Sequence, residues 1–173
     1  QAELRRNIGL VLQDPFLYHG TIASNIRMYR ESLSQAEVEE AARFVDAHDF
    51  ISQLPQGYDN PVTERGSTFS SGQRQLLAFA RTIATKPKIL ILDEATANID
   101  SETEELIQHS LRKMRQGRTT IAIAHRLSTI QDANCIYVLD KGRIIESGSH
   151  EELLAQNGTY KKMYQLQAGM MDA

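Results

Sequence analysis

The sequence contains a single cysteine, few aromatic residues and no apolar run long enough to cross a bilayer. Cys135 cannot form a disulfide within the chain, which suits a reducing compartment. No stretch reaches the ~18–20 apolar residues that a membrane-spanning helix needs, and no signal peptide is visible. The net charge of -3 leaves no broad basic face, so we expect no nucleic acid partner. What remains is a chain of 173 residues with the size and composition of one globular domain.

Apolar runs alternate with helical patterns along the chain. Residues 8–12 predict a buried strand, residues 89–92 and 119–124 predict two further strands, and 135–148 predicts a hairpin that turns at Lys141-Gly142. Capping boxes, which mark helix starts, occur at Ser34 and Glu37, Ser70 and Gln73, Ser101 and Glu104, and Ser149 and Glu152. The first box starts a helix predicted over 34–47. This alternation indicates an α/β fold with a mostly parallel sheet covered by helices.

Polar side chains end three of the predicted strands. Gln13 follows the first strand, Asp93 and Glu94 follow the second, and His125 follows the third. The carboxyl ends of strands in an open α/β sheet share one edge, where ligands bind. An amide, two carboxylates and an imidazole at one edge suit a divalent cation, an attacking water and a phosphate. Each residue alone is weak evidence, but together they favour a nucleotide site.

A second anion-binding feature lies in the stretch 69–81, whose sequence is FSSGQRQLLAFAR. It begins with the small polar residues Ser70, Ser71, Gly72 and Gln73 and continues as an apolar helix. The exposed amides at the start of a helix favour a phosphate. The stretch therefore predicts a contact with a phosphate group.

Taken together, these motifs resemble the nucleotide-binding domain of ATP-binding cassette (ABC) transporters, most closely the multidrug-exporter type. The family's Q-loop region resembles LVLQDPFLYHGTIASNI, and its LSGGQ signature resembles FSSGQRQLLAFAR. Its Walker B segment with the D-loop resembles ILILDEATANID, and its switch-histidine loop resembles IAHRLSTI. The motifs follow the family's order and cover nearly the whole chain.

The resemblance implies an α/β, P-loop NTPase-like ABC ATPase domain, with a mostly parallel sheet flanked by helices and an inserted helical subdomain. It divides the chain into a core strand ending at the Q-loop glutamine (1–13), a helical signature subdomain (14–85), an ATPase core (86–150) and C-terminal helices (151–173). The implied function is ATP hydrolysis that energises export across a membrane. The implied location is the cytoplasmic face of the cell membrane.

The resemblance also implies the roles of single residues, with ATP and Mg2+ as cofactors. Asp93 would hold the Mg2+, and Gln13 would contact both the Mg2+ and the attacking water. Glu94 would be the general base, and His125 would contact the γ-phosphate. Asp100, in the D-loop, would face a second nucleotide-binding domain.

Two partners follow from the resemblance. The signature residues Ser70, Ser71, Gly72 and Gln73 would touch ATP held by the second nucleotide-binding domain. A transmembrane domain would contact the Q-loop region around Gln13. No nucleic acid partner is implied.

One expected motif is absent from the sequence. No G-x-x-x-x-G-K-[ST] loop occurs, although the family places this Walker A loop upstream of the Q-loop glutamine. The chain begins at Gln1 and enters a strand almost at once, so we interpret it as the C-terminal part of the domain, with the N-terminal part missing. Because that loop supplies most of the grip on the phosphates, we expect the isolated chain to bind ATP weakly and to be inactive.

The signature departs from the family's pattern. Ser71 stands where the first glycine of the signature usually stands, and Phe69 stands where the signature usually has leucine. Outside the signature, the D-loop residues 97–100 and Pro61 also differ from the family's pattern. The general-base candidate Glu94 is intact. Heterodimeric exporters of this family pair one competent site with one degenerate site, so the combination suggests one half of a heterodimer. A homodimer in which Ser71 is tolerated drift is the alternative.

Two other functions remain open from the sequence. A soluble ABC-type ATPase of DNA maintenance or repair also has a signature helix and a Walker B pair, but the acidic balance and the lack of a coiled-coil insertion speak against it. A regulatory ABC module that no longer hydrolyses ATP is the second alternative. The intact Asp93, Glu94 and His125 speak against that module.

Overall fold

A computed structural model of the chain describes residues 7–28, 30–63, 66, 68–94, 101–124 and 126–169. The side chains of Glu94, Ser101 and Glu102 are outside this description. The chain forms two compact units, residues 1–123 and 124–173. None of the described helices is both long and apolar enough to span a membrane.

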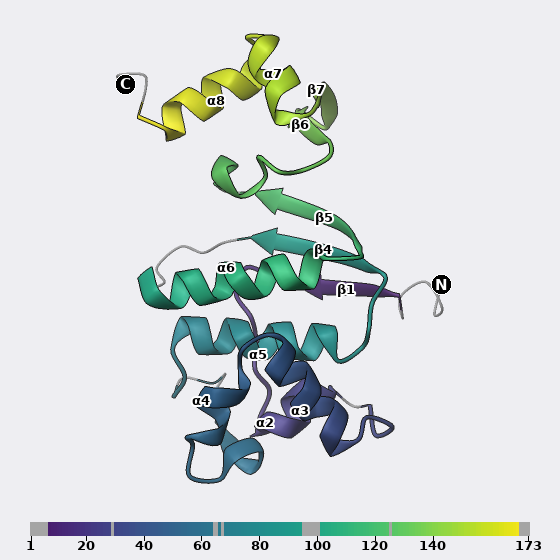
Figure 1. Cartoon of the computed structure of the whole chain (residues 1–173), viewed down its shortest axis with the longest axis vertical. Coiled ribbons are helices and arrows are strands. Elements are labelled where there is room, and N and C mark those ends of the chain that lie inside the picture. The colour runs from purple at the N-terminus through teal and green to yellow at the C-terminus, as the bar shows by residue number, and fades with distance from the viewer. Residues whose placement is uncertain are drawn as a thin grey trace. The chain divides into compact units, whose positions relative to one another are not determined.

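A three-stranded sheet forms the centre of the first unit. Its strands are β1 (Ile8–Val11), β4 (Ile89–Glu94) and β5 (Thr119–Ala124), in the order β1-β4-β5. β1 and β4 are parallel, with Ile8 beside Ile89 and Val11 beside Leu92. The arrows of all three strands point the same way in Figure 1. The predicted strands and the mostly parallel sheet are therefore confirmed.

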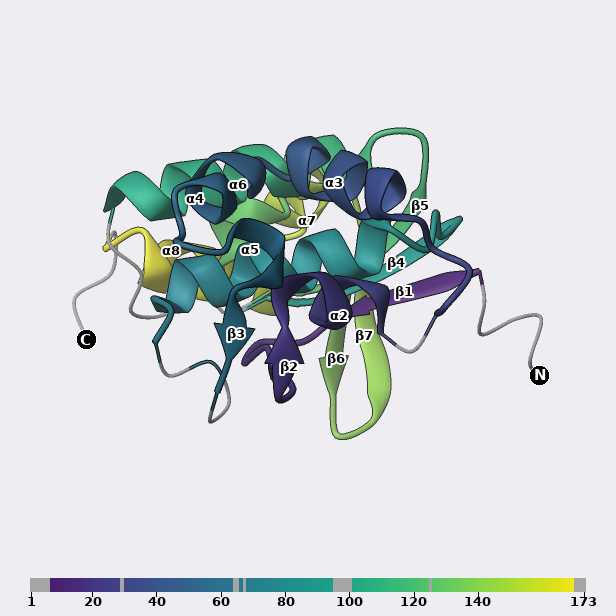
Figure 2. The same cartoon turned by 90° about the horizontal axis from the view of Figure 1, so that it is seen from below.

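Helices α5 (Ser71–Ile83) and α6 (Ser101–Arg115) form a layer on one face of this sheet, as Figure 2 shows. α5 approaches β1 closely at Gly9, where an added Cβ would lie 2.6 Å from Cγ2 of Thr82. On the other face Leu10 and Ile121 are about half exposed, at 53% and 56%. Within the first unit, the predicted helical cover is thus present on one face of the sheet.

The segment between β1 and β4 is helical and rich in loops, as predicted. It contains α2 (Ile22–Arg27), α3 (Gln35–Phe44), α4 (His48–Ser52), the 3-10 turn η1 (Gly57–Asp59) and the short antiparallel strands β2 (Gly20–Thr21) and β3 (Pro61–Val62). Its apolar side chains join α5 and the sheet in one core. Completely buried members of that core include Leu17, Ile22, Ile26, Val38, Ile51, Leu77, Phe79, Leu90, Ile107 and Met114.

The helix predicted over 34–47 ends earlier, at Phe44. The reason is Asp46, whose backbone is left-handed with φ of 59°. Its carboxylate accepts hydrogen bonds from Ser110 Oγ at 3.1 Å and from Lys113 Nζ at 3.1 Å, and lies 3.0 Å from His109 Nδ1. Burial works to raise the pKa of Asp46, but the bonds from Lys113 and His109 outweigh it and hold that pKa below its ordinary value. Asp46 therefore ties the α3–α4 turn to α6.

The second unit is built on a hairpin of β6 (Ile136–Asp140) and β7 (Arg143–Gly148). Both turn residues have positive φ, 48° at Lys141 and 77° at Gly142, as a tight two-residue hairpin turn requires. The hairpin packs with η3 (Leu127–Thr129), α7 (His150–Ala155) and α8 (Thr159–Gln167) around a small core of Leu127, Ile136, Val138, Leu153 and Tyr160. The predicted hairpin is confirmed.

Candidate functional site

The carboxyl ends of β1 and β4 bring Gln13 and two carboxyl residues to one edge of the sheet. Val11 lies beside Leu92 in the parallel register. Gln13 lies two residues beyond the end of β1, and Glu94 is the last residue of β4. The Gln13 side chain is exposed and that of Asp93 is half-buried. The edge therefore offers amide and carboxylate oxygens to a ligand in solvent.

Two of the predicted site residues lie outside the described residues. His125 directly follows β5, which neighbours β4 in the sheet and points the same way (Figure 1). Asp100 precedes the first residue of α6. The grouping of Gln13, Asp93, Glu94 and His125 and the roles of these residues stay predictions.

The start of α5 is held by a capping box, as the sequence predicts. Ser70 Oγ accepts a hydrogen bond from Gln73 N at 3.1 Å, and Ser70 N donates to Gln73 Oε1 at 3.0 Å. The first turn contains no acidic residue. Because Ser71 and Gly72 are the first two residues of the helix, their amides have no carbonyl of an earlier helical turn to bond. The helix dipole and these amides together favour an anion at this end.

The unusual Ser71 fits this helix start without backbone strain. It is the first residue of α5 and is absent from the described non-glycine residues with positive φ. A serine in place of glycine would cost about 1–2 kcal/mol only in a left-handed backbone. Any effect of Ser71 on a bound phosphate must therefore come from its side chain.

Gly72 is where the starts of α5 and α6 meet. A Cβ built on Gly72 would lie 2.0 Å from Cγ2 of Thr103, in the first turn of α6. Real Cβ atoms do not approach so closely, so any larger residue at position 72 would require the Thr103 side chain or one of the helices to shift. The contact joins the signature stretch to the helix that follows the predicted D-loop residue Asp100.

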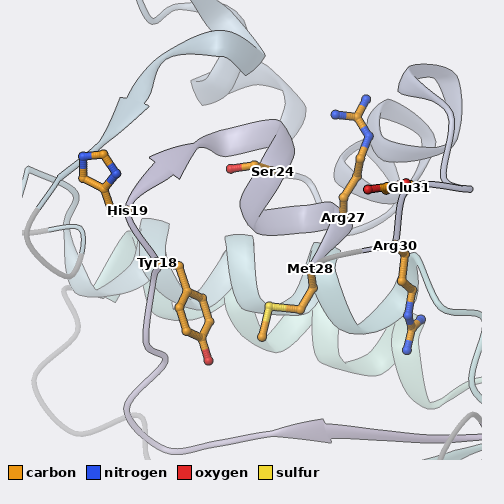
Figure 3. Close-up of a pocket in the computed structure, with 7 residues that line it drawn as sticks. All are labelled: Tyr18, His19, Ser24, Arg27, Met28, Arg30 and Glu31. Atoms are coloured by element: carbon orange, nitrogen blue, oxygen red, sulfur yellow. The ribbon is translucent and has the colours of Figure 1, made fainter.

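A pocket of about 250 Å3, shown in Figure 3, lies beside α2. The side chains of Tyr18 and Met28 lie below the ribbon of α2 in that view, and Arg27 lies above it. Tyr18, His19, Ser24, Arg27, Met28, Arg30 and Glu31 line the pocket. Sequence reasoning did not predict the pocket. The weak signal for it was the stretch 18–31, where aromatic, basic and turn residues mix without a regular period.

The parallel sheet, the inserted helical segment and the polar edge define an ABC-type ATPase domain. The sequence profile described as ABC transporter matches residues 1–97, and the chain belongs to this family. The chain is also 80% identical over 171 residues to a putative ABC transporter ATP-binding protein, exp8, of Streptococcus pneumoniae. That match covers 99% of this chain and 29% of the relative.

Two further matches are described as a multidrug resistance transporter and as an exporter. The probable multidrug resistance ABC transporter ATP-binding/permease protein YheH of Bacillus subtilis is 56% identical over 98% of this chain and 25% of its own length. A solved bacterial Atm1-family ABC exporter with ATP bound superposes with a TM-score of 0.86 at 48% identity, covering 96% of this chain and 29% of that one.

The resemblance to exporter-type nucleotide-binding domains and the predicted fold class are thereby confirmed. The chain spans less than a third of the length of these relatives. They give no support to the DNA-maintenance alternative.

Proposed function

We propose that the chain forms part of an ATP-hydrolysing domain that energises export of a substrate across a membrane. The observation that carries the proposal is the common edge where β1 ends next to Gln13 and β4 ends in Asp93 and Glu94. The exporter descriptions of close relatives support it. By the same analogy, the domain works at the cytoplasmic face of the membrane.

The residues at this edge of the sheet have separate roles in ATP hydrolysis. Asp93 holds Mg2+, with Gln13 as a further oxygen donor that also contacts the attacking water. Mg2+ usually takes one or two carboxylates and completes its shell with water and phosphate oxygens. A bound Mg2+ neutralises charge on the phosphates.

Glu94 acts as the general base in this proposal. Its carboxylate takes a proton from the water that attacks the terminal phosphate, a general-base role that contributes about 10²–10⁴-fold in rate. His125, which directly follows β5, contacts the γ-phosphate and holds it in line with that water.

A second nucleotide-binding domain completes the site. Ser70, Ser71, Gly72 and Gln73 close over ATP held by that domain, and Asp100 faces it across the interface. The capping box and the absence of acidic residues in the first turn support this contact. The intact Glu94 together with the altered Ser71 favours a heterodimer over a homodimer. The signature of this chain then serves the weaker of the two sites.

A transmembrane domain is the second proposed partner, and it docks at the pocket beside α2. The pocket combines an apolar floor from Tyr18 and Met28 with the basic Arg27 and Arg30. Such a lining suits an amphipathic helix with acidic residues on one side. The pocket belongs to the segment that follows Gln13, so docking there reaches the nucleotide edge through a short stretch of chain.

The isolated chain binds ATP weakly and does not turn it over, in this proposal. Its sequence contains no G-x-x-x-x-G-K-[ST] loop. The edge residues supply Mg2+ and water contacts, whereas the backbone amides and the lysine of such a loop supply most of the phosphate contacts.

The substitution Glu94→Gln in the assembled exporter, with the partner domain present, tests the proposed function. We expect ATP hydrolysis to fall about 10²–10⁴-fold, while ATP binding is retained because the amide keeps the size of the side chain. Glu105→Gln, at an exposed position of α6, is the matched control and should hydrolyse ATP at the wild-type rate. Unchanged turnover in Glu94→Gln would instead support a regulatory module without hydrolysis.

A further inference from the structure

The far end of α5 carries an arginine that binds the segment leading to the pocket. Arg81 is half-buried near the C-terminus of α5. Its Nε donates to the carbonyl oxygen of Asn25 at 2.8 Å, and one terminal nitrogen donates to the carbonyl oxygen of Phe16 at 2.9 Å. The other terminal nitrogen donates to Asn25 Oδ1 at 3.0 Å. One guanidinium thus holds two points of the segment 16–25.

Asn25 fixes the same segment from within. Its side chain is buried, with 2% of the residue exposed. Asn25 Nδ2 donates to the carbonyl oxygens of Tyr18 and Thr21 at 2.8 and 2.9 Å, and Oδ1 accepts from Tyr18 N at 2.8 Å. Oδ1 therefore bonds to both Tyr18 and Arg81. A shift of either Tyr18 or Arg81 must disturb the hydrogen bond to the other residue, because the buried Asn25 amide cannot form a replacement hydrogen bond with water.

The Tyr18 ring completes this contact. The guanidinium carbon of Arg81 lies 5.5 Å from the centroid of that ring, within the range of a cation–π interaction. Burial lowers the pKa of Arg81 from its ordinary value. The described ion pairs do not include Arg81, so neutral acceptors and a ring satisfy its charge. A lysine could not replace it, since an ammonium group lacks the planar fork that reaches three separated oxygens.

These contacts connect the two functional ends of the domain. The capping box at Ser70 begins α5, and Arg81 lies about 16 Å further along the same helix. Tyr18 lines the pocket and Asn25 belongs to α2, which flanks it. We propose that Arg81, together with Asn25, is a positioning residue that transmits movement of the signature helix to the pocket segment and back. This inference rests on the proposed function of the signature in closing over ATP.

Hydrogen exchange measured by mass spectrometry in the assembled exporter, reconstituted in lipid nanodiscs, tests the inference. Deuterium uptake is compared without nucleotide and with ATP, Mg2+ and orthovanadate, for peptides covering 16–28 and 69–76. We expect nucleotide to change uptake in both peptides of the wild type. In Arg81→Met the change at 16–28 is lost, while the change at 69–76 remains. Arg81→Lys keeps the charge without the fork and should show the same loss if Arg81→Met does not fold.

Arg118→Met is the matched control. Arg118 also binds backbone carbonyls, donating to Pro87 at 3.1 Å and to Met114 at 2.9 Å, but it does not contact the pocket segment. Both peptides should respond to nucleotide in this variant, even if its stability falls. A purely structural role for Arg81 would raise uptake at 16–28 equally with and without nucleotide and leave the nucleotide-dependent difference in place.

Three outcomes overturn the inference. The first is a nucleotide-dependent change at 16–28 that persists in both Arg81 variants. The second is a wild type in which 69–76 responds to nucleotide and 16–28 does not, and in this case the proposed function stands. The third is a wild type in which neither peptide responds, which contradicts the proposed function and the inference with it.

Discussion

Replacing Gly72 by alanine perturbs the contact between α5 and α6 at its tightest point. The added Cβ would lie 2.0 Å from Cγ2 and 3.3 Å from Cβ of Thr103, and 3.6 Å from Cδ1 of Ile107. Carbon atoms in contact normally lie about 3.5–4.0 Å apart, so the clash with Cγ2 is short by more than 1 Å. Thr103 is β-branched and lies within a helix, where few side-chain rotamers are open to it. The Thr103 side chain or the two helices must therefore shift.

The expected cost is that of overpacking a core, about 1–3 kcal/mol of unfolding free energy. For a domain of this size, each kcal/mol lowers the temperature at which the domain unfolds by about 2–4 °C. Calorimetry or circular dichroism of the exporter subunit measures this shift. ATP hydrolysis should also fall, because α6 begins directly after Asp100 and the signature amides begin α5.

The companion substitution Thr103→Ser removes Cγ2 and provides the control. It should be nearly neutral alone and should restore much of the stability lost in Gly72→Ala, which appears as a coupling energy in a double-mutant cycle. A Gly72→Ala subunit with an unchanged melting temperature, or one that Thr103→Ser does not rescue, would refute the close approach of the two helices.

Three further predictions concern pH, nucleotide affinity and the partner. Because the pKa of Asp46 is lowered in the folded state, its stabilising contribution is present above the ordinary carboxyl pKa and is lost as pH falls through the lowered value. Chemical denaturation from about pH 5 down to about pH 2 should show that loss, and Asp46→Asn should reduce it. Titration calorimetry of the isolated chain should detect no micromolar ATP binding, and micromolar affinity would contradict the proposed need for a phosphate loop. The exporter subunit purified without a partner should be a poor ATPase, and brisk hydrolysis by a homodimer would rule out the proposed heterodimer.

The features that were predictable from sequence are those set by neighbouring residues. The capping boxes at Ser34, Ser70 and Ser149 each depend on a side chain three residues away, and all three are present. The turn at Lys141-Gly142 is equally local. The early end of α3 was missed because the left-handed Asp46 is held by α6, more than 60 residues further along the chain.

In the candidate site, too, the features that could be predicted are the local ones. The polar residues that follow the strands were predictable from the sequence because each apolar run ends in a charged or amide side chain. The pocket beside α2 could not be predicted from the sequence, since it depends on the contacts that fix the segment 16–25. Arg81 and Asn25 are separated by 56 positions, and neither residue has a sequence pattern that names its partner.

The nucleotide retained by the Glu94→Gln exporter tests the central claim most directly. The variant is incubated with ATP and Mg2+, freed of unbound nucleotide, and the bound nucleotide is identified by chromatography. Our account predicts that intact ATP remains bound, because binding persists without the general base. The wild type treated in the same way should retain mainly ADP or nothing. Bound ADP in Glu94→Gln, formed at the wild-type rate, would contradict the assignment of hydrolysis to this edge of the sheet.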